Sequence, residues 1–217
     1  MQGFFITFEG IEGCGKSTQV TLLAQALQTK GYEVVTTREP GGTPIGQTLR
    51  QILLHSTETP LAQGTEVLLM LADRAQHIQE VIAPGLRDGK IVISDRFVDS
   101  TTAYQGYGRE IDHSLLTRLN AFACDGYLPS LTIVLDLPVA EGLSRASKRR
   151  GSSTIIDHFE AESLAFHERV REGFLAVARA EPQRVQVLNG QQLIEALHQE
   201  ILVLVKSRLA ENEQRHR

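Results

Sequence analysis

A glycine-rich segment near the start of the sequence carries residue types that bind phosphate. It reads Gly10-Ile11-Glu12-Gly13-Cys14-Gly15-Lys16-Ser17, which matches the G-x-x-x-x-G-K-[ST] pattern of a P-loop. Its glycines let the backbone wrap around phosphate oxygens, so that successive N–H groups face the anion. Lys16 supplies a positive charge near the β- and γ-phosphates, and the Ser17 hydroxyl can ligate Mg²⁺. The segment predicts a nucleotide site made of these residues: Gly10, Ile11, Glu12, Gly13, Cys14, Gly15, Lys16, Ser17 and Thr18.

The alternative interpretation of this segment is a chance glycine-rich turn. The apolar run Phe4–Phe8 precedes it and reads as a buried strand, and the residues that follow it have helical periodicity. Because a P-loop joins a strand to a helix in this way, we favour the nucleotide site. We interpret Cys14 as a small neutral filler of the loop rather than as a redox switch.

An aspartate and an arginine end a second apolar run, Ile91-Val92-Ile93-Ser94-Asp95-Arg96. A carboxylate at the end of a buried strand can hold Mg²⁺ through its water shell. A guanidinium can grip a phosphate with two parallel hydrogen bonds. On its own the pair could equally form a surface ion pair. Because it ends a buried run, we expect it in the site, with Ser17 and Asp95 holding the metal.

Short apolar runs separated by helical stretches would position both groups. The runs that read as strands are residues 4–8, 34–36, 91–93, 131–135 and, more weakly, 185–188. The stretches with helical periodicity include residues 20–27, 68–75 and 194–204. This pattern predicts an α/β fold of the P-loop NTPase type, a doubly wound five-stranded parallel sheet flanked by helices, in one domain of residues 1–217. Ligands bind beyond the carboxyl ends of such strands, where both motifs lie.

The composition excludes several classes of protein. The chain has 217 residues, of which 41% are hydrophobic and 22% charged, so it can bury an ordinary globular core. Its two cysteines rule out a disulfide framework, and we expect reduced thiols. A net charge of −4 gives no broad basic surface for nucleic acid or an anionic membrane, although it does not exclude one cationic pocket. Because the sequence shows no targeting segment and no membrane-spanning segment, we expect a cytoplasmic protein. We expect it to bind neither nucleic acid nor a membrane.

The P-loop does not by itself name the reaction. The N-K-x-D motif of GTPases and the L-S-G-G-Q motif of ABC-type ATPases are absent from the sequence. The chain is also too short to leave much room for a motor or helicase partner domain. A small P-loop kinase remains, and such an enzyme needs a second pocket for the group that accepts the phosphate.

Four segments of the sequence resemble the thymidylate kinase family, in the family's order and spacing. They are the P-loop with its flanks (residues 8–18), Arg38-Glu39-Pro40-Gly41-Gly42-Thr43, Ala72-Asp73-Arg74, and Asp95-Arg96-Phe97-Val98-Asp99-Ser100-Thr101-Thr102-Ala103-Tyr104-Gln105-Gly106. The last segment is much more specific than the P-loop, and the fit to the bacterial type is close. The resemblance implies phosphorylation of dTMP to dTDP by ATP with Mg²⁺, a step in dTTP synthesis. It also implies a homodimer formed through helices, for which residues 61–72 offer a Leu- and Ala-rich surface.

The resemblance implies roles for individual residues around dTMP. Arg74 would hydrogen-bond a thymine carbonyl, and Arg96 would contact the acceptor phosphate. Tyr104 would crowd the sugar 2′ position, and Glu12 would lie near the 3′-hydroxyl. The residues implied for dTMP are Glu12, Arg38, Glu39, Arg50, Met70, Arg74, Arg96, Ser100, Thr101, Tyr104 and Gln105.

Met70 departs from the family, which usually has a phenylalanine there that stacks on thymine. A methionine can still cover a base face, but it forfeits aromatic stacking, and it can also be plain helix core. The departure leaves open a kinase for another deoxynucleotide or for a deoxynucleoside. A non-catalytic nucleotide-binding module is a third reading, which would have no reason to keep an acceptor pocket and the basic segment described next.

A basic segment follows the fourth predicted strand. We expect a helix over Val139–Ala146, and residues 145–150 then hold four cations ahead of a stretch rich in Gly, Ser and Thr. The interpretation without a function is a solvated basic loop. The functional interpretation is a lid of about residues 145–158 that closes over ATP, because cations there would stabilise the charge that develops during phosphoryl transfer.

The sequence of the P-loop favours the interpretation of the basic segment as a lid. Some members of the family carry an arginine directly after the P-loop acid, where this chain has Gly13, and members with glycine there resemble this one in having lid arginines. We therefore expect Lys16, Arg96 and either Arg149 or Arg150 to be catalytic. The resemblance further implies that Arg145 stacks on adenine and that His158 replaces a lid cation.

Overall fold

The fold is a five-stranded parallel sheet with the strand order β2-β3-β1-β4-β5. The structure is a computed structural model that describes residues 3–55, 61–150 and 158–215. The strands are β1 (Phe4–Glu9), β2 (Val34–Arg38), β3 (Ile91–Asp95), β4 (Leu131–Asp136) and β5 (Val185–Asn189), and all neighbouring pairs are parallel. Each apolar run predicted to be a strand forms one, including the weaker run at residues 185–188.

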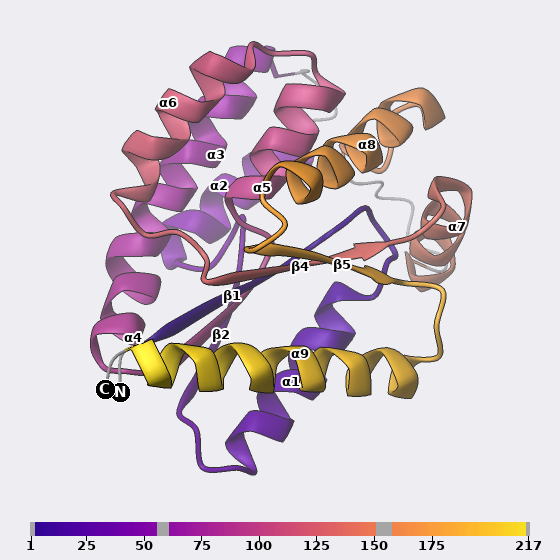
Figure 1. Ribbon diagram of the computed structural model, residues 1–217. Coiled ribbons are helices and arrows are strands. Elements are labelled where there is room, and N and C mark those ends of the chain that lie inside the picture. Colours follow the sequence, from indigo (N-terminus) through magenta and orange to yellow (C-terminus); the bar gives the residue numbers. More distant parts are fainter. Residues whose placement is uncertain (1–2, 56–60, 151–157, 216–217) are drawn as a thin grey trace.

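Helices cover both faces of this sheet (Figure 1). On one face lie α1 (Lys16–Gln28) and α9 (Ile194–Arg215). On the other lie α2 (Pro44–His55), α3 (Gln63–His77), α6 (His113–Cys124) and α8 (Leu164–Ala180). The short elements η1 (Ile78–Ile82) and η2 (Thr102–Gly108), both π-helical, and α4 (Ala83–Arg87) and α5 (Val98–Thr101) connect them, and α7 (Val139–Arg150) follows β4. The predicted doubly wound architecture is confirmed.

The middle strand, β1, is buried along its whole length because helices pack against both of its faces. Its six residues are all buried, including the polar Thr7 and Glu9. The Thr7 hydroxyl is paired with the hydroxyl of Thr132 on β4 at 2.7 Å, so burial leaves neither group without a partner. The apolar side chains of β1, β3 and β4 form the centre of the main core with the inner faces of α1, α8 and α9.

The element that follows the P-loop is a helix, as its apolar spacing predicts. Val20, Leu23 and Leu27 form the buried face of α1. Gly15 precedes the helix with a φ of 98°, a left-handed conformation that favours glycine. Gly31 lies beyond the helix end with a φ of 87° and turns the chain toward β2.

One helix is longer than its sequence pattern predicts. We expected a helix over Val139–Ala146, whereas α7 runs on to Arg150. The added turn is basic, and cations near a helix C-terminus are favoured by the helix dipole and by their own helix propensity. Most of the basic segment therefore belongs to a helix. The remainder of the expected lid, residues 151–157, lies outside the described residues.

Across the described ranges, none of the helices combines the length and the apolar character that crossing a bilayer requires.

Candidate functional site

The P-loop has the backbone geometry of a phosphate cradle. Gly10, Gly13 and Gly15 have φ values of 130°, 73° and 98°, conformations that side-chain-bearing residues rarely adopt. The Lys16 ammonium lies against the loop and donates hydrogen bonds to the carbonyl oxygens of Gly10 at 3.0 Å and Ile11 at 2.8 Å. A cation held over a ring of backbone N–H groups makes a strong anion site.

The P-loop packs directly on the first turn of α7 through two glycines. A Cβ atom on Gly13 would lie 2.1 Å from the Gly142 carbonyl oxygen, and one on Gly142 would lie 2.5 Å from the Glu12 carbonyl oxygen. Both distances are far below van der Waals contact, so only glycine fits at either position. The loop therefore has no room for an arginine after Glu12, and α7 stands beside the phosphate cradle.

Ser17 and Asp95 form an oxygen pair at the edge of the cradle. The register of the sheet sets Asp95 opposite Phe8, so that β3 ends beside the start of the P-loop. The Ser17 hydroxyl donates a 2.6 Å hydrogen bond to Asp95 Oδ2. A hydroxyl and a carboxylate are hard oxygen donors, and Mg²⁺ in nucleotide sites takes its other ligands from phosphate and water. The described residues contain no group of three His, Cys, Asp or Glu side chains that could hold a metal alone, so phosphate would have to complete this site.

Arg96 lies near Lys16, since both side chains donate to the Gly10 carbonyl oxygen, and its contacts span the site. Its φ of 75° is left-handed, an uncommon conformation for arginine that orients the side chain back over the P-loop. Its guanidinium donates hydrogen bonds to the Gly10 carbonyl at 3.0 Å, to Ser100 Oγ at 3.2 Å and to Tyr104 Oη at 3.0 Å. The same group pairs with Glu12 Oε1 at 3.1 Å. One cation therefore connects the P-loop with the η2 segment.

Glu12 is held as a carboxylate within this group. Burial raises the pKa of the Glu12 carboxyl, but the nearby His167 ring and the charges of Arg96 and Lys16 lower it further, to about 2. His167 Nδ1 lies 3.5 Å from Glu12 Oε2, and the Tyr104 hydroxyl donates to Oε1. The carboxylate is therefore a hydrogen-bond acceptor at neutral pH.

A buried carboxyl group, that of Glu9, holds the residues that flank Arg96. Glu9 Oε1 accepts a 2.8 Å hydrogen bond from the backbone N–H of Phe97, and Oε2 pairs with Ser100 Oγ at 2.6 Å. Burial and the charge of Asp99 raise the pKa of Glu9 to about 8. The end of β1 is thereby bonded to the turn that follows β3, which fixes the backbone on both sides of Arg96.

Arg74 forms the opposite wall of the site with Glu39. Its Nε donates to Glu39 Oε2 at 2.9 Å, and its Nη groups donate to Thr101 Oγ1, Asn120 Oδ1 and the Phe97 carbonyl oxygen. These hydrogen bonds use four of the five N–H groups of a guanidinium. Glu39 Oε1 also contacts His77 Nδ1 at 2.9 Å. Arg74 is only 2% exposed, so its remaining N–H is the part that a ligand can reach.

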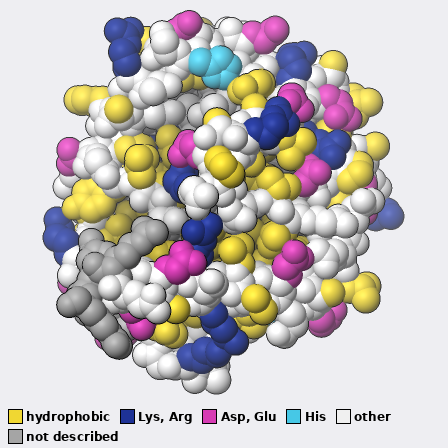
Figure 2. All heavy atoms as spheres, in the orientation of Figure 1, with side chains coloured by type: hydrophobic (Ala, Val, Ile, Leu, Met, Phe, Trp, Pro, Cys, Tyr) yellow, Lys and Arg dark blue, Asp and Glu magenta, His cyan; other side chains and the backbone are white. Residues whose placement is uncertain are grey.

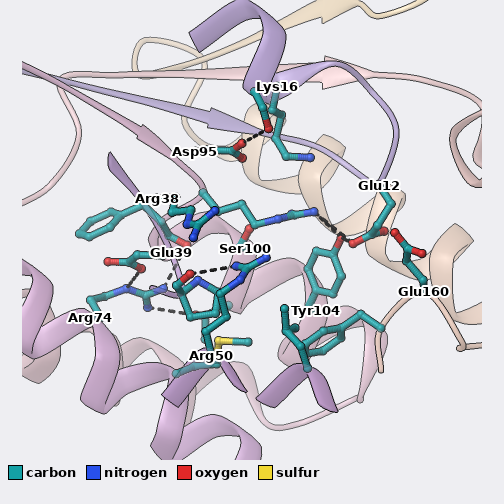
Figure 3. A pocket seen from close by; sticks show the side chains of 18 of the residues that line it. Glu12, Lys16, Arg38, Glu39, Arg50, Arg74, Asp95, Ser100, Tyr104 and Glu160 are labelled. Carbon is teal, nitrogen blue, oxygen red and sulfur yellow. Dashed lines mark hydrogen bonds and ion pairs between the residues drawn. The ribbon is translucent and has the colours of Figure 1, made fainter. Parts of the chain in front are cut away.

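These groups surround one cavity of about 220 Å³, which we call the P-loop cavity (Figure 3). Its described lining includes every residue that the sequence implied for dTMP: Glu12, Arg38, Glu39, Arg50, Met70, Arg74, Arg96, Ser100, Thr101, Tyr104 and Gln105. It also includes Gly13, Lys16, Ser17, Asp95 and Arg149. Figure 3 shows Lys16 and Asp95 on one side of the space, Arg74 with Glu39 on another, and Glu12 near Tyr104. Residues from distant parts of the sequence thus meet at one place.

The basic segment reaches the cavity in part. Arg149 lines it, and its guanidinium lies 3.7 Å from Glu160 Oε1. Arg145 instead contacts Glu141 and donates to the Gly190 carbonyl oxygen at 3.1 Å, beside the cradle rather than in the cavity lining. The side chain of Arg150 lies outside the described residues.

The sequence analysis did not identify several residues of the site. Pro40, Leu54, Phe97, Phe159 and Glu160 also line the cavity. Phe97 and Pro40 lie inside the segments that carried the resemblance, and the apolar character of Phe97 after Asp95-Arg96 was a usable signal. The residues that contact the lining from behind gave no signal. Glu66, Asn120 and His167 belong to helices with ordinary apolar spacing, and Arg109 lies in the turn after η2.

The surface around the site has no extended charge of one sign on the face seen in Figure 2. There, Lys and Arg side chains are interspersed with Asp and Glu. The cations that line the P-loop cavity come instead from separate elements that converge on it: the start of α1, the end of β2, α2, α3, the residue after β3 and the end of α7. A chain of net charge −4 can thus gather cations for a polyanionic ligand.

Comparison with known proteins gives consistent results. The sequence matches the family described as thymidylate kinase over residues 8–201. A thymidylate kinase of Geobacter sulfurreducens is 54% identical over 196 residues, which cover 89% of this chain and 92% of that protein. One of Geotalea uraniireducens is 47% identical over 211 residues, 96% of this chain and 99% of that protein. The crystal structure of thymidylate kinase from Ehrlichia chaffeensis is similar with a TM-score of 0.76 at 37% identity, covering 95% of this chain and 99% of that chain.

Proposed function

This chain belongs to the thymidylate kinase family and phosphorylates dTMP to dTDP with ATP, and from that premise we propose how its residues divide the work. The observation that carries the proposal is the P-loop cavity. In it the phosphate cradle, the Ser17–Asp95 pair and the residues implied for dTMP face one enclosed space. Donor and acceptor phosphates can meet there without large movements of the sheet.

The donor nucleotide binds at the P-loop. The N–H groups between Gly10 and Ser17 cradle its phosphates, and Lys16 places a charge beside the β- and γ-phosphates. Ser17 and Asp95 would hold Mg²⁺, which would supply positive charge to offset the negative charge of the phosphates. Arg145 stands beside the cradle, where adenine stacking on its planar guanidinium is geometrically open.

The acceptor dTMP binds on the far side of the same space. Arg96 supplies positive charge for the acceptor phosphate. Its Nη hydrogen bonds go to Gly10, Ser100, Glu12 and Tyr104, so phosphate oxygens would replace some of these partners. Arg38 and Arg50 add positive charge from the cavity wall. The remaining N–H of Arg74 is available to a thymine carbonyl oxygen. Glu12, ionised and accepting, is suited to the sugar 3′-hydroxyl.

The base and sugar have further neighbours. Met70 covers one base face without stacking. Ser100, Thr101 and Gln105 provide polar atoms around the ring, while Tyr104 fills the space beside the sugar 2′ position.

Transfer then depends on positioning and charge rather than on a general base. The acceptor is already an ionised phosphate at neutral pH, so no side chain needs to remove a proton from it. Lys16, Arg96 and the lid cations Arg149 and Arg150 stabilise the charge of the transferring group. Arg149 lies 3.7 Å from Glu160 and lines the cavity, on the side from which it would meet the transferring group.

We further propose a cytoplasmic homodimer that uses the exposed side of α3 and α6. Leu68, Leu115 and Phe122 are 62%, 40% and 85% exposed there, and an apolar group of this size is typical of a surface that a partner covers. The two helices pack on each other beneath these side chains, so the surface is firmly supported. Both cysteines are free and buried, which suits a reducing compartment.

A steady-state assay with MgATP and a panel of acceptors tests the proposal. We expect dTMP to have the highest kcat/KM, above dUMP, dCMP, dGMP and thymidine. A higher value for dCMP or for thymidine would favour the alternative acceptors that Met70 left open. Lys16→Ala should lower turnover with every acceptor, since it removes the charge from the cradle, and full turnover in that variant would contradict the role assigned to the P-loop.

A further inference from the structure

Behind the P-loop cavity a buried carboxylate holds the side-chain amide of a lining residue. Gln105, on η2, lines the cavity, and Glu66, on α3, lies behind it without reaching the lining. The two side chains are almost completely buried, with exposures of 1% and 2%. Gln105 Nε2 donates a 2.9 Å hydrogen bond to Glu66 Oε1.

Arg109 keeps Glu66 in the form that only accepts hydrogen bonds. Its Nη2 donates to Glu66 Oε2 at 3.1 Å, and its Nε donates to Oε1 at 3.3 Å. Both oxygens of this carboxylate therefore accept from the guanidinium, and a carboxylate has no hydrogen to donate. Gln105 therefore has to direct its NH₂ group toward Glu66, since the reverse orientation would set its carbonyl oxygen against the carboxylate.

This constraint decides which atom of the amide the ligand meets. With one N–H of its NH₂ group bonded to Glu66, Gln105 keeps its nitrogen toward α3, and its carbonyl oxygen lies at the other end of the amide and can face the cavity. An amide in an open site can flip to suit its ligand, whereas a buried one cannot exchange its partner for water. The cavity thus presents a fixed hydrogen-bond acceptor at this position.

We propose that Glu66 is a specificity-determining residue: by fixing the orientation of Gln105 it makes the site select an acceptor base that carries a ring N–H and reject one with a bare ring nitrogen. The inference rests on the proposed placement of the acceptor base against Gln105. Thymine and uracil carry a proton on N3 and can donate to the Gln105 carbonyl oxygen. Cytosine has an unprotonated N3, so two acceptors would face each other in a dry pocket and both would lose their hydrogen bonds.

The substitution Glu66→Gln tests this directly. A glutamine at position 66 can accept from the Gln105 NH₂ group or donate to its carbonyl oxygen, so both orientations of Gln105 become satisfied. The variant should raise the ratio of kcat/KM for dCMP to kcat/KM for dTMP by about 10-fold or more, the size expected when an unpaired buried polar group gains a partner. The ratio for dUMP to dTMP should not change, because uracil shares the N3 proton of thymine.

A matched control separates this effect from the loss of a charge near the lid. Glu162→Gln removes a carboxylate that also pairs with Arg109 but has no described contact with Gln105. Its dCMP to dTMP ratio should equal that of the wild-type protein. Equal dCMP to dTMP ratios in a folded Glu66→Gln variant and the wild type would overturn the proposal. So would an increase that dUMP shares, which would indicate a generally loosened pocket.

A second measurement needs no variant and covers the case in which Glu66→Gln does not fold. The deoxynucleotide of 2-pyrimidinone has an unprotonated N3 and no 4-substituent, so, unlike dCMP, it sets no amino group against Arg74. In the wild-type protein its kcat/KM should be at least about 10-fold below that of dUMP. Equal values would overturn the proposal.

Gln105→Leu distinguishes this inference from the proposed site. If Gln105→Leu leaves kcat/KM for dTMP unchanged, the placement of the base against Gln105 is wrong. If Gln105→Leu lowers it while Glu66→Gln leaves the dCMP to dTMP ratio unchanged, only the orienting role of Glu66 is wrong.

Discussion

The Ser17 hydroxyl donates a 2.6 Å hydrogen bond to the Asp95 carboxylate, which joins the first turn of α1 to the last residue of β3. The two residues are far apart in sequence, and the parallel pairing of β1 with β3 places them side by side. Each would supply oxygen to Mg²⁺, and each already has its partner in position. The Mg²⁺ requirement of the reaction can therefore be tested by substituting either residue.

Asp95→Asn should weaken the binding of Mg²⁺ in the site. The amide keeps an oxygen for Ser17 but lacks the negative charge that attracts the cation, so the Mg²⁺ concentration for half-maximal rate should rise about 10-fold or more. Chelation of divalent cations should abolish transfer in both proteins. Titration of Mg²⁺ at saturating ATP and dTMP measures the effect, with Thr21→Ala, one turn further along α1, as the control. An unchanged Mg²⁺ dependence in Asp95→Asn would remove Asp95 from the metal site.

Arg149→Ala should lower kcat by on the order of 100-fold, the usual cost of removing one group that stabilises transition-state charge. The KM for dTMP should change little, because Arg149 acts on the transferring phosphoryl group rather than on the base or sugar. Lys148→Ala is the matched control, since Lys148 is an exposed cation on the same turn of α7 that does not line the cavity. Equal kcat values in Arg149→Ala and Lys148→Ala would favour the interpretation of the basic segment as a solvated surface segment rather than as a lid.

The buried Glu9 carboxyl should make the protein less stable as the pH rises. Its pKa is about 8 in the folded protein against an ordinary value of 4.5, so between these values the folded state holds a proton that the unfolded state has lost. The free energy of unfolding then falls with rising pH, by at most about 1.4 kcal/mol per pH unit for one proton. Glu9→Gln resembles the protonated form and should remove this slope.

Thermal melts at pH 6 and pH 8 measure that difference. The wild-type Tm should fall between the two values more than the Tm of Glu9→Gln does. Glu181→Gln is a suitable control, because hydrogen bonding to Arg184 lowers the pKa of Glu181 and its titration lies below this pH range. Parallel Tm changes in wild type and Glu9→Gln would show that another group titrates.

Phe122→Glu should weaken self-association. Phe122 is the most exposed of the apolar side chains on α3 and α6, and a charge there would be buried without a partner in a dimer. The dissociation constant should rise about 10-fold or more, measured by sedimentation velocity. Leu193→Glu, a charge at an apolar side chain that is 78% exposed next to α9, should leave it unchanged. A wild-type protein that is monomeric at micromolar concentration would exclude this interface.

The sequence predicted the strands and the phosphate cradle because both depend on local patterns. Continuous apolar runs such as Ile91–Ile93 have few alternatives to a buried strand, and the P-loop needs glycine, lysine and serine at fixed spacing. The end of α7 was not predicted, because helix propensity and a basic composition are compatible with either a helix or a loop.

The supporting residues could not be predicted for a different reason. His167 approaches Glu12 from a helix 155 positions away, and Asn120 meets Arg74 from another helix. Such partners depend on how α8 and α6 pack over the sheet. That packing leaves only a generic apolar spacing in the sequence, so the chemistry of these residues was visible only in three dimensions.

The backbone contact between Gly13 and Gly142 has a mechanical consequence. The main chains of the two segments meet here, and the Ile11 side chain packs on Gly142 as well, so the contact holds little free space to absorb a displacement. A shift of the P-loop on binding phosphate would therefore press on the first turn of α7, two turns before Arg149. Occupancy of the nucleotide site and the position of Arg149 would then be coupled by excluded volume.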